Sequence, residues 1–281
     1  MRLILPLVLS VLLGACAGGQ RFSLNHIDLN QAMAIGQNVV KASSDLSDSE
    51  EIDLGSGIAA NLLGAAPLTQ NAEMQRYVNR VGQWLALQTE RPELPWRFGV
   101  LDSPNVNAFA TPGGYIFVTR GLLLRLNNES ELAGVLAHEI AHVLQRHHVS
   151  AIRKSAGAEA LAGVANMAAA QRGDWRSQQR GKLFSAGTEL YITGLSKDDE
   201  LAADRAGVVI AARAGYHPYG LISVLQTLNR INPQDGAVAL MFKTHPTPAS
   251  RMDALDQAMG NRMARYETGV IDTPRFAKLK K

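Results

Sequence analysis

The apolar and polar positions first divide the chain into short amphipathic segments. Ser47 with Glu50 three residues later has the pattern of a capping box, which predicts a helix through about Leu63. A second helix is predicted over 72–89, where apolar residues with helical spacing share one face: Tyr77, Val78, Val81, Trp84 and Leu85.

The period then changes from helical spacing to alternation. Trp96, Phe98 and Val100 alternate with other residues, and YIFVT at 115–119 is rich in β-branched and aromatic side chains. TPGG at 111–114 has strong turn chemistry. This section predicts a small antiparallel sheet with the strand near Asn105–Thr111 at its edge.

The second half of the chain again favours helices. Asn128 and Glu131 resemble a capping pair that opens a helix through about Arg153, and Ser196 with Asp199 resembles another. The further segments are predicted as a helix over 156–170, a loop over 171–182, and helices over 197–213, from Pro218, and over 249–263. The chain is therefore expected to be α+β and mainly helical, with the small sheet beside a central helix.

Composition and charge fit a globular protein. Of 281 residues, 46% are hydrophobic and 19% are charged, so the chain can bury a sizeable core. The net charge of +3 is mild, and part of the excess lies in the tail AKLKK at 277–281. Nucleic acid is therefore not an expected partner.

The first residues have the anatomy of a bacterial secretory signal. Arg2 precedes the apolar run Leu3–Leu13, which is shorter than the roughly 20 residues that span a bilayer. LGAC at 13–16 resembles a lipobox, and Cys16, the only cysteine, is the predicted lipidation site. Cleavage of an ordinary signal peptide nearby is the alternative. Ala17 stands where an aspartate would favour inner-membrane retention, so we expect a lipid anchor at the periplasmic face of the outer membrane.

The stretch VLAHEIAHVLQRHH at 135–148 carries the candidate chemistry. His138 and His142 are four residues apart and share one helix face, so both imidazoles can reach one metal ion. Glu139 then has the place of the general base in an H-E-x-x-H motif. Five-residue motifs recur by chance, and two polar residues on a surface helix are the alternative. The apolar flanks argue against it, because they predict a buried helix whose polar groups need a partner.

His147 and His148 raise the possibility of a third histidine ligand on the same helix. Such a pattern needs a glycine at 145 to break the helix, and the residue there is Gln145. On an unbroken helix His148 would lie about 80° away from His138 at 100° per residue. We therefore assign His147 and His148 to the helix surface.

The third ligand is expected from DDELAADRAG at 198–207. Glu200 and Asp204 are one turn apart on one helix face, so Glu200 can bind the metal while Asp204 holds the second ring nitrogen of a ligand histidine. An ordinary acidic helix N-terminus is the alternative, and it accounts for Asp198 and Asp199.

Four motifs in order now carry a family resemblance. HEIAH, ELAADRAG, NAFATPGGYIFVTRGLL and HPTPASRM resemble the zinc metallopeptidase family that includes HtpX, the mitochondrial protease Oma, the CAAX prenyl endopeptidase and BepA. The likeness covers roughly residues 48–260 and is strongest to BepA-like outer-membrane lipoprotein peptidases. It implies a zincin-like fold. The membrane-spanning helices of HtpX and the TPR repeats of BepA are not expected in this sequence.

The resemblance also implies roles for single residues. One zinc ion per chain is expected on His138, His142 and Glu200, with Glu139 catalytic and Asp204 orienting a ligand. His245 is expected either to act as a latch on the zinc or to stabilise the oxyanion, although capping the helix after Pro246 is a further alternative. The residues expected to contact substrate are Asn107, Ala108, Phe109 and Ala110.

Together these observations predict a zinc metalloendopeptidase for unfolded or misassembled cell-envelope proteins, in outer-membrane quality control. The rival hypothesis is a chaperone-like zinc-binding lipoprotein that recognises such proteins without cleaving them. The predicted organisation is a signal peptide at 1–15, a lipid-anchored tether with a short helix at 16–46, a catalytic domain at 47–263 and a basic tail at 264–281.

Overall fold

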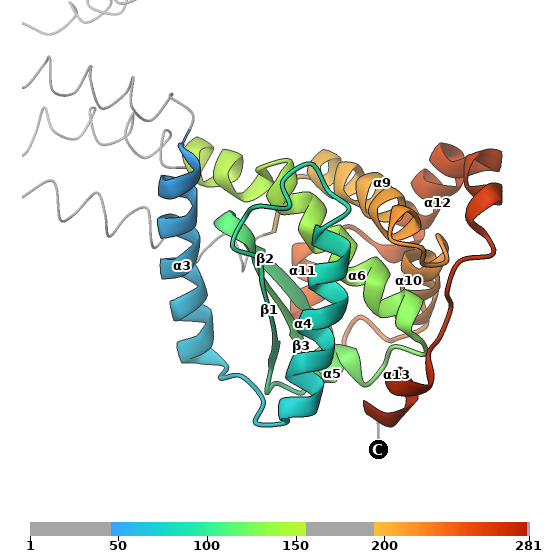
Figure 1. Ribbon diagram of the computed structural model, residues 1–281, viewed down its shortest axis with the longest axis horizontal. Coiled ribbons are helices and arrows are strands. Elements are labelled where there is room, and N and C mark those ends of the chain that lie inside the picture. Colours follow the sequence, from blue (N-terminus) through green and yellow to red (C-terminus); the bar gives the residue numbers. More distant parts are fainter. Residues whose placement is uncertain (1–45, 156–193, 280–281) are drawn as a thin grey trace, which may run out of the picture. The chain divides into compact units, whose positions relative to one another are not determined.

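The computed structural model describes residues 46–155 and 194–279, all of which belong to the unit Ser44–Lys281. The predicted α+β, mainly helical architecture is confirmed (Figure 1). The elements in chain order are α3 (Asp48–Ala65), α4 (Ala72–Ala86), β1 (Arg97–Leu101), β2 (Ala108–Thr111), η2 (Pro112–Gly114), β3 (Tyr115–Thr119), α5 (Arg120–Leu123), α6 (Glu129–Leu144), α9 (Lys197–Arg213), α10 (Gly220–Asn229), α11 (Ala239–Thr244), α12 (Pro248–Met259), η3 (Gly260–Tyr266) and α13 (Pro274–Leu279). Residues 147–155 are also helical.

The sheet is mixed, which corrects the expectation of an antiparallel sheet. Its strand order is β1-β3-β2, with β2 antiparallel and β1 parallel to β3. The tight turn at TPGG, where Gly113 has a φ of 74°, forces β2 and β3 into a hairpin. The segment 102–107 reverses the chain before β2, so β1 and β3 run in the same direction. Alternation predicts strands but not their direction. The predicted edge position of β2 is confirmed.

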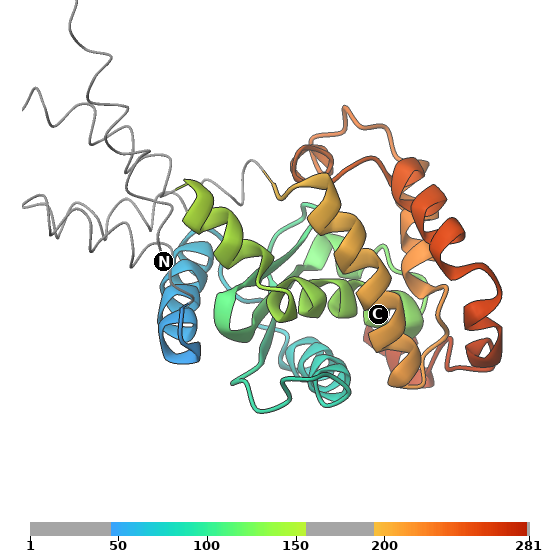
Figure 2. The ribbon, with the colours of Figure 1, turned by 90° about the horizontal axis from the view of Figure 1, so that it is seen from above.

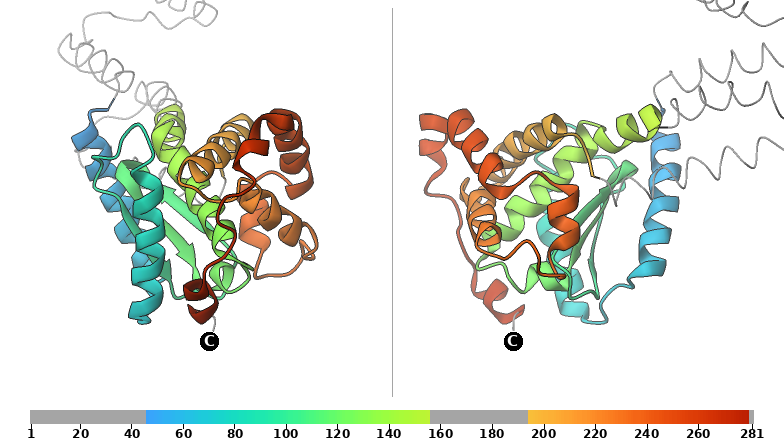
Figure 3. Two further views of the ribbon diagram at one scale, coloured as in Figure 1. Left: turned by 45° about the vertical axis from the view of Figure 1, so that its right-hand side comes forward. Right: turned by 180° about the vertical axis from the view of Figure 1, so that it is seen from behind.

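Successive residues of the sheet are buried on opposite faces. Ile116 and Val118 of β3 belong to the main core with α4 and α6, whereas Phe117 packs with Phe109 and with Ala59 of α3. Figure 3 shows α3 on the side of the sheet opposite α6. The sheet is thus covered on both faces, and α6 lies directly against the edge strand β2.

Helix α6 runs through the middle of the domain. It contacts β2 and α4 on one side and α9 and α10 on the other, with α12 packed against α9 and α10 (Figure 2). The predicted caps are present: the side chains of Ser47, Asn128 and Ser196 accept hydrogen bonds from the third backbone N–H of their helices. The helix predicted from Pro218 begins at Gly220.

Part of the segment predicted as a basic tail packs against the domain. Phe276 of α13 is buried beside Tyr77. Glu129, the first residue of α6, accepts hydrogen bonds from the hydroxyls of Tyr77, Tyr216 and Thr273. This buried carboxylate therefore ties α4, the segment after α9 and the C-terminal segment to the start of the central helix.

Several predictions lie outside the described residues. They are the signal peptide, Cys16, the helix predicted within 16–46, the helix over 156–170 and the loop over 171–182. In the parts of the chain that the structure describes, every helix is too short or too polar to cross a membrane.

Candidate metal centre and active site

The predicted metal ligands of α6 lie deep in the domain. His138, Glu139 and His142 are 3%, 4% and 1% exposed. The one-turn spacing brings the Nε2 atoms of His138 and His142 to 3.0 Å from each other. The prediction of a buried rather than a surface helix is confirmed, since residues on all sides of α6 are buried.

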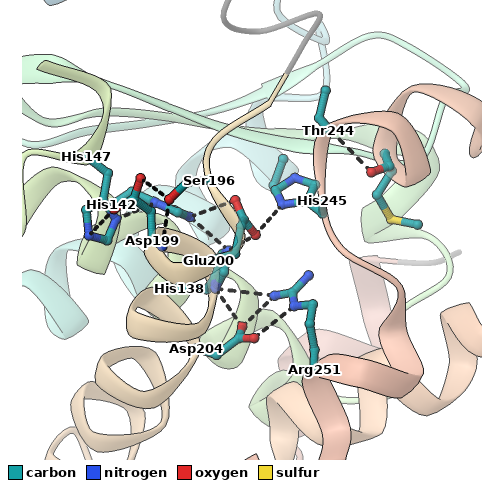
Figure 4. A network of polar contacts seen from close by, with 12 residues as sticks. His138, His142, His147, Ser196, Asp199, Glu200, Asp204, Thr244, His245 and Arg251 are labelled. Carbon is teal, nitrogen blue, oxygen red and sulfur yellow. Dashed lines mark hydrogen bonds and ion pairs between the residues drawn. The ribbon is translucent and has the colours of Figure 1, made fainter. Parts of the chain in front are cut away.

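Helix α9 brings Glu200 to the same point (Figure 4). Its Oε2 lies 3.6 Å from Nε2 of His138 and its Oε1 lies 3.5 Å from Nε2 of His142. The close packing of the two helices depends on Gly207, where an added Cβ would lie 2.9 Å from the backbone nitrogen of His138. The absence of a side chain there lets α9 carry Glu200 within reach of both imidazoles.

The spacing of these three ligands fits a single ion. Zinc binds nitrogen and oxygen ligands at about 2.0–2.2 Å, so neighbouring ligands of a tetrahedral site lie roughly 3.3–3.6 Å apart. The observed separations of 3.0, 3.5 and 3.6 Å are close to that range. Two imidazoles and a carboxylate, all buried, are also the donor set that a catalytic zinc site uses.

Asp204 holds the other nitrogen of His138. Its Oδ1 lies 2.9 Å from Nδ1 of His138, as the spacing on α9 predicts. Arg251 of α12 donates to both oxygens, at 2.9 and 2.5 Å. Burial raises the pKa of Asp204, but the charge and hydrogen bonds of Arg251 outweigh it and lower that pKa. Asp204 thus stays ionised and accepts from Nδ1, which leaves Nε2 of His138 for a metal.

Glu139 lies in a pocket that also contains the predicted ligands. The pocket is lined by Ala108, Phe109, Ala110, Glu139, His142, His148, Gly194, Leu195, Glu200, Thr244 and His245. Burial raises the pKa of Glu139, and favourable electrostatic interactions of its carboxylate with neighbouring side chains only partly oppose that rise. The carboxyl group is therefore a stronger base than an exposed glutamate.

His245 follows α11 and faces Glu200. Its Nδ1 lies 2.6 Å from Oε2 of Glu200, and one nitrogen or oxygen of each of His138, Glu200 and His245 falls within 4.8 Å of the others. Burial lowers the pKa of His245, but the Glu200 carboxylate raises it more. Burial raises the pKa of Glu200, and His245 reverses this and brings it to about 2. The N-cap of α12 is Thr247, so His245 does not cap that helix.

The assignment of His147 and His148 to a helix surface is wrong. Helix α6 ends at Leu144, and Arg146 adopts a left-handed φ of 53° that redirects the chain. His147 and His148 are consequently 7% and 8% exposed, and Nδ1 of His147 lies 3.0 Å from Nδ1 of His142. His148 also lines the pocket, and burial lowers its pKa to about 4.

The cause of this break lies in a distant helix. Arg146 forms ion pairs with Asp48 and Glu51 of α3, at 2.7 and 3.1 Å. These contacts hold a conformation that a non-glycine residue rarely adopts. The sequence QRH at 145–147 contains no residue that usually ends a helix. The break could therefore be predicted only from the tertiary contact with α3.

The predicted substrate strand lies beside this centre. Ala108, Phe109 and Ala110 line the pocket, whereas Asn107 is not among its lining residues. Asn107 is buried at the entry to β2, where its Oδ1 accepts from the backbone of Ala108. Its Nδ2 has no hydrogen-bond partner among the described residues. The substrate role of these residues stays a prediction.

Comparison with known proteins finds one peptidase family and several relatives. The model of peptidase family M48 matches residues 72–259. The beta-barrel assembly-enhancing protease of Yersinia pestis is 31% identical over 247 residues, which cover 85% of this chain and 50% of that protein. The mitochondrial metalloendopeptidase OMA1 of Schizosaccharomyces pombe is 29% identical, over 68% of this chain and 55% of that protein. The metalloprotease YcaL of Escherichia coli is 26% identical, over 80% and 85%. The chain thus spans about half the length of the beta-barrel assembly-enhancing proteases that it matches.

Proposed function

This chain belongs to peptidase family M48, and on that premise we propose that it is a zinc-dependent endopeptidase that hydrolyses peptide bonds of cell-envelope proteins. One observation carries the proposal. His142, Glu200 and the candidate base Glu139 line one pocket, and His138 faces Glu200 from the same helix as Glu139. A structural zinc site is closed by four protein ligands and has no use for a base beside it.

We propose that His138, His142 and Glu200 hold one zinc ion. When bound, zinc would polarise the scissile carbonyl and lower the pKa of the attacking water from about 15.7 toward about 7. Glu139 accepts a proton from that water while the water oxygen forms a bond to the carbonyl carbon. It then delivers the proton to the amine nitrogen as the peptide bond breaks. The Glu139 carboxyl group lines the same pocket as His142 and Glu200, which places it for both transfers.

We propose that His245 acts on this reaction in one of two ways. As a latch, it would occupy the remaining coordination position and block substrate. As an oxyanion stabiliser, it would donate a hydrogen bond to the carbonyl oxygen as negative charge develops there. Its position 2.6 Å from Glu200 supports a role in the site but is compatible with both.

We propose that substrates bind as an extended strand beside β2, so that backbone pairing supplies affinity and sequence selectivity stays broad. Unfolded or misassembled envelope proteins expose such segments. The edge position of β2 and its place in the pocket support this mode. The name of the Yersinia pestis relative links that protein to β-barrel assembly. That name, the signal-like run Leu3–Leu13 and the lipobox-like sequence at Cys16 together support our proposal that this protein is lipid-anchored at the periplasmic face of the outer membrane.

The variant Glu139→Gln tests the catalytic proposal. It should keep zinc but lose cleavage of an unfolded substrate such as casein, because the amide cannot accept the proton. Glu73→Gln, on an exposed position of α4, is the matched control and should cleave as the wild type does. Unchanged cleavage by Glu139→Gln would refute the mechanism. We do not favour the chaperone-like alternative, which requires that the wild-type protein bind casein without cutting it.

His245→Ala distinguishes the two roles of His245. Basal proteolysis should rise if His245 is a latch, because its removal opens the coordination position. Proteolysis should fall strongly, with little change in KM, if His245 stabilises the oxyanion. The zinc content of the variant, measured alongside, separates either effect from loss of the metal.

A further inference from the structure

His142 has a hydrogen-bond partner, His147, that its predicted role as a metal ligand does not account for. Its Nε2 faces Glu200 and His138, while its Nδ1 lies 3.0 Å from Nδ1 of His147. The two rings meet edge to face at an interplanar angle of 72°. Both side chains are buried, so water does not compete for this contact. His147 therefore touches His142 on the nitrogen that a metal would leave unused.

We propose that His147 is the positioning residue of His142, fixing its tautomer and ring orientation for metal binding through Nε2. The inference rests on the proposed zinc site. It pairs each ligand histidine of α6 with its own partner, because His138 has Asp204 at its Nδ1 in the same way. Such partners of ligand histidines orient the ring and make the ligand nitrogen more basic.

The proton positions follow from the geometry. To bind a metal through Nε2, the neutral ring of His142 must carry its proton on Nδ1. That N–H points at Nδ1 of His147, which must then be the acceptor and hold no proton. The proton of His147 is thereby placed on its Nε2. One hydrogen bond thus sets the tautomers of two rings.

The outer nitrogen of His147 meets an acidic residue of α9. Oδ1 of Asp199 lies 3.7 Å from Nε2 of His147, which is longer than a hydrogen bond but close for a favourable charge–dipole contact. Asp199 is itself held, because its Oδ2 accepts from the hydroxyl of Ser196 at 2.7 Å. The cap of α9 therefore keeps an acceptor on the side where His147 carries its proton (Figure 4).

Arg146 explains why His147 reaches this place. On a continued helix the residue five positions after His142 would lie about 140° around the axis. The left-handed turn at Arg146 instead starts a new helical segment with His147 turned inward. Asp48 and Glu51 hold that turn from α3. The position of His147 is thus specified by contacts outside the helix that carries His142.

The test compares His147→Asn with His147→Leu in the purified zinc-binding protein. The two replacements have nearly the same shape, but only Asn offers an oxygen that can accept from Nδ1 of His142. Zinc affinity is measured by competition with a chelator of known affinity, and the cobalt-substituted proteins are compared by their visible d–d absorption. His147→Leu should bind zinc about 10–100-fold more weakly and change the cobalt spectrum. His147→Asn should retain most of the affinity and the wild-type spectrum.

Controls separate this result from misfolding and from failure of the proposed function. His217→Ala, which removes an imidazole outside the pocket lining, should leave zinc affinity unchanged. Thermal melting of the metal-free variants reports the fold, and His147→Ala replaces His147→Leu if the latter does not fold. Wild-type affinity in the acceptor-free variant, or equal losses in the Asn and Leu variants, would overturn the inference while leaving the zinc site intact. A wild-type protein that binds no zinc would overturn the proposed function, and the inference with it.

Discussion

Gly207 sets the distance between the two helices that supply the candidate ligands, so Gly207→Ala should disturb the metal centre without touching a ligand. The added Cβ would lie 2.9 Å from N and 3.0 Å from Cα of His138. Ordinary contact begins near 3.4 Å, so the helices must separate by roughly 3.4 − 2.9 = 0.5 Å at this point. Both neighbours are backbone atoms, which cannot rotate away.

Two free energies oppose each other in this variant. Overpacking of a tight contact costs about 1–3 kcal/mol. Replacing glycine by alanine within a helix returns about 1 kcal/mol. We therefore expect the metal-free protein to lose about 0–2 kcal/mol in its free energy of unfolding. Zinc binding should weaken as well, because metal sites tolerate ligand displacements of only about 0.2 Å. We expect roughly tenfold weaker zinc binding, equivalent to about 1.4 kcal/mol.

The assay is zinc affinity by chelator competition, together with denaturant unfolding of the metal-free protein. Gly64→Ala is the matched control, because a Cβ at that position of α3 meets nothing within 4 Å. It should leave zinc affinity unchanged and stabilise the protein by up to about 1 kcal/mol. If Gly207→Ala binds zinc as tightly as the wild type, the close approach of α6 and α9 does not position Glu200, and the reasoning is refuted.

Three further outcomes follow from the same structure. Asp204→Asn should weaken zinc binding about 10–100-fold and destabilise the fold by about 3–5 kcal/mol, since Arg251 stays buried without its counter-charge; chelator competition and urea unfolding measure the two losses. Removing zinc should lower the melting temperature reversibly, by an amount that reflects about 4 kcal/mol when zinc is present at 1,000 times its Kd, and a melt unaffected by chelator would contradict this. Burial and the hydrogen bond to Glu129 raise the pKa of Tyr216 in the folded state. The stability that its neutral hydroxyl contributes is therefore complete below pH 10 and declines above it, and Tyr216→Phe should flatten that decline in unfolding measurements made between pH 9 and about 11.

Much of this centre could be predicted from local sequence because its candidate ligands lie on regular helices. His138 and His142, and likewise Glu200 and Asp204, are one turn apart, and helical geometry brings each pair to one face whatever surrounds it. The caps at Ser47, Asn128 and Ser196 were predictable for the same reason, since each bond is made within three residues.

The predictions that were wrong concern features determined by contacts between distant parts of the chain. The parallel pairing of β1 with β3 depends on the order of the strands in the sheet. The alternation of apolar and polar residues carries no information about that order. The turn at Arg146 is held by carboxylates about 100 residues earlier in the chain, so helix propensity gave the wrong course for His147 and His148. His147 could be recognised as a neighbour of His142 only after that turn was known.

Helix α3 precedes the region, residues 72–259, that matches the family model. Yet it covers one face of the sheet and holds Arg146 in place through Asp48 and Glu51. A fragment that starts at residue 72, where the match to the family model begins, would expose Phe117 to solvent and release the turn behind His142. The smallest autonomously working piece of this protein must therefore include α3 and start near Ser47.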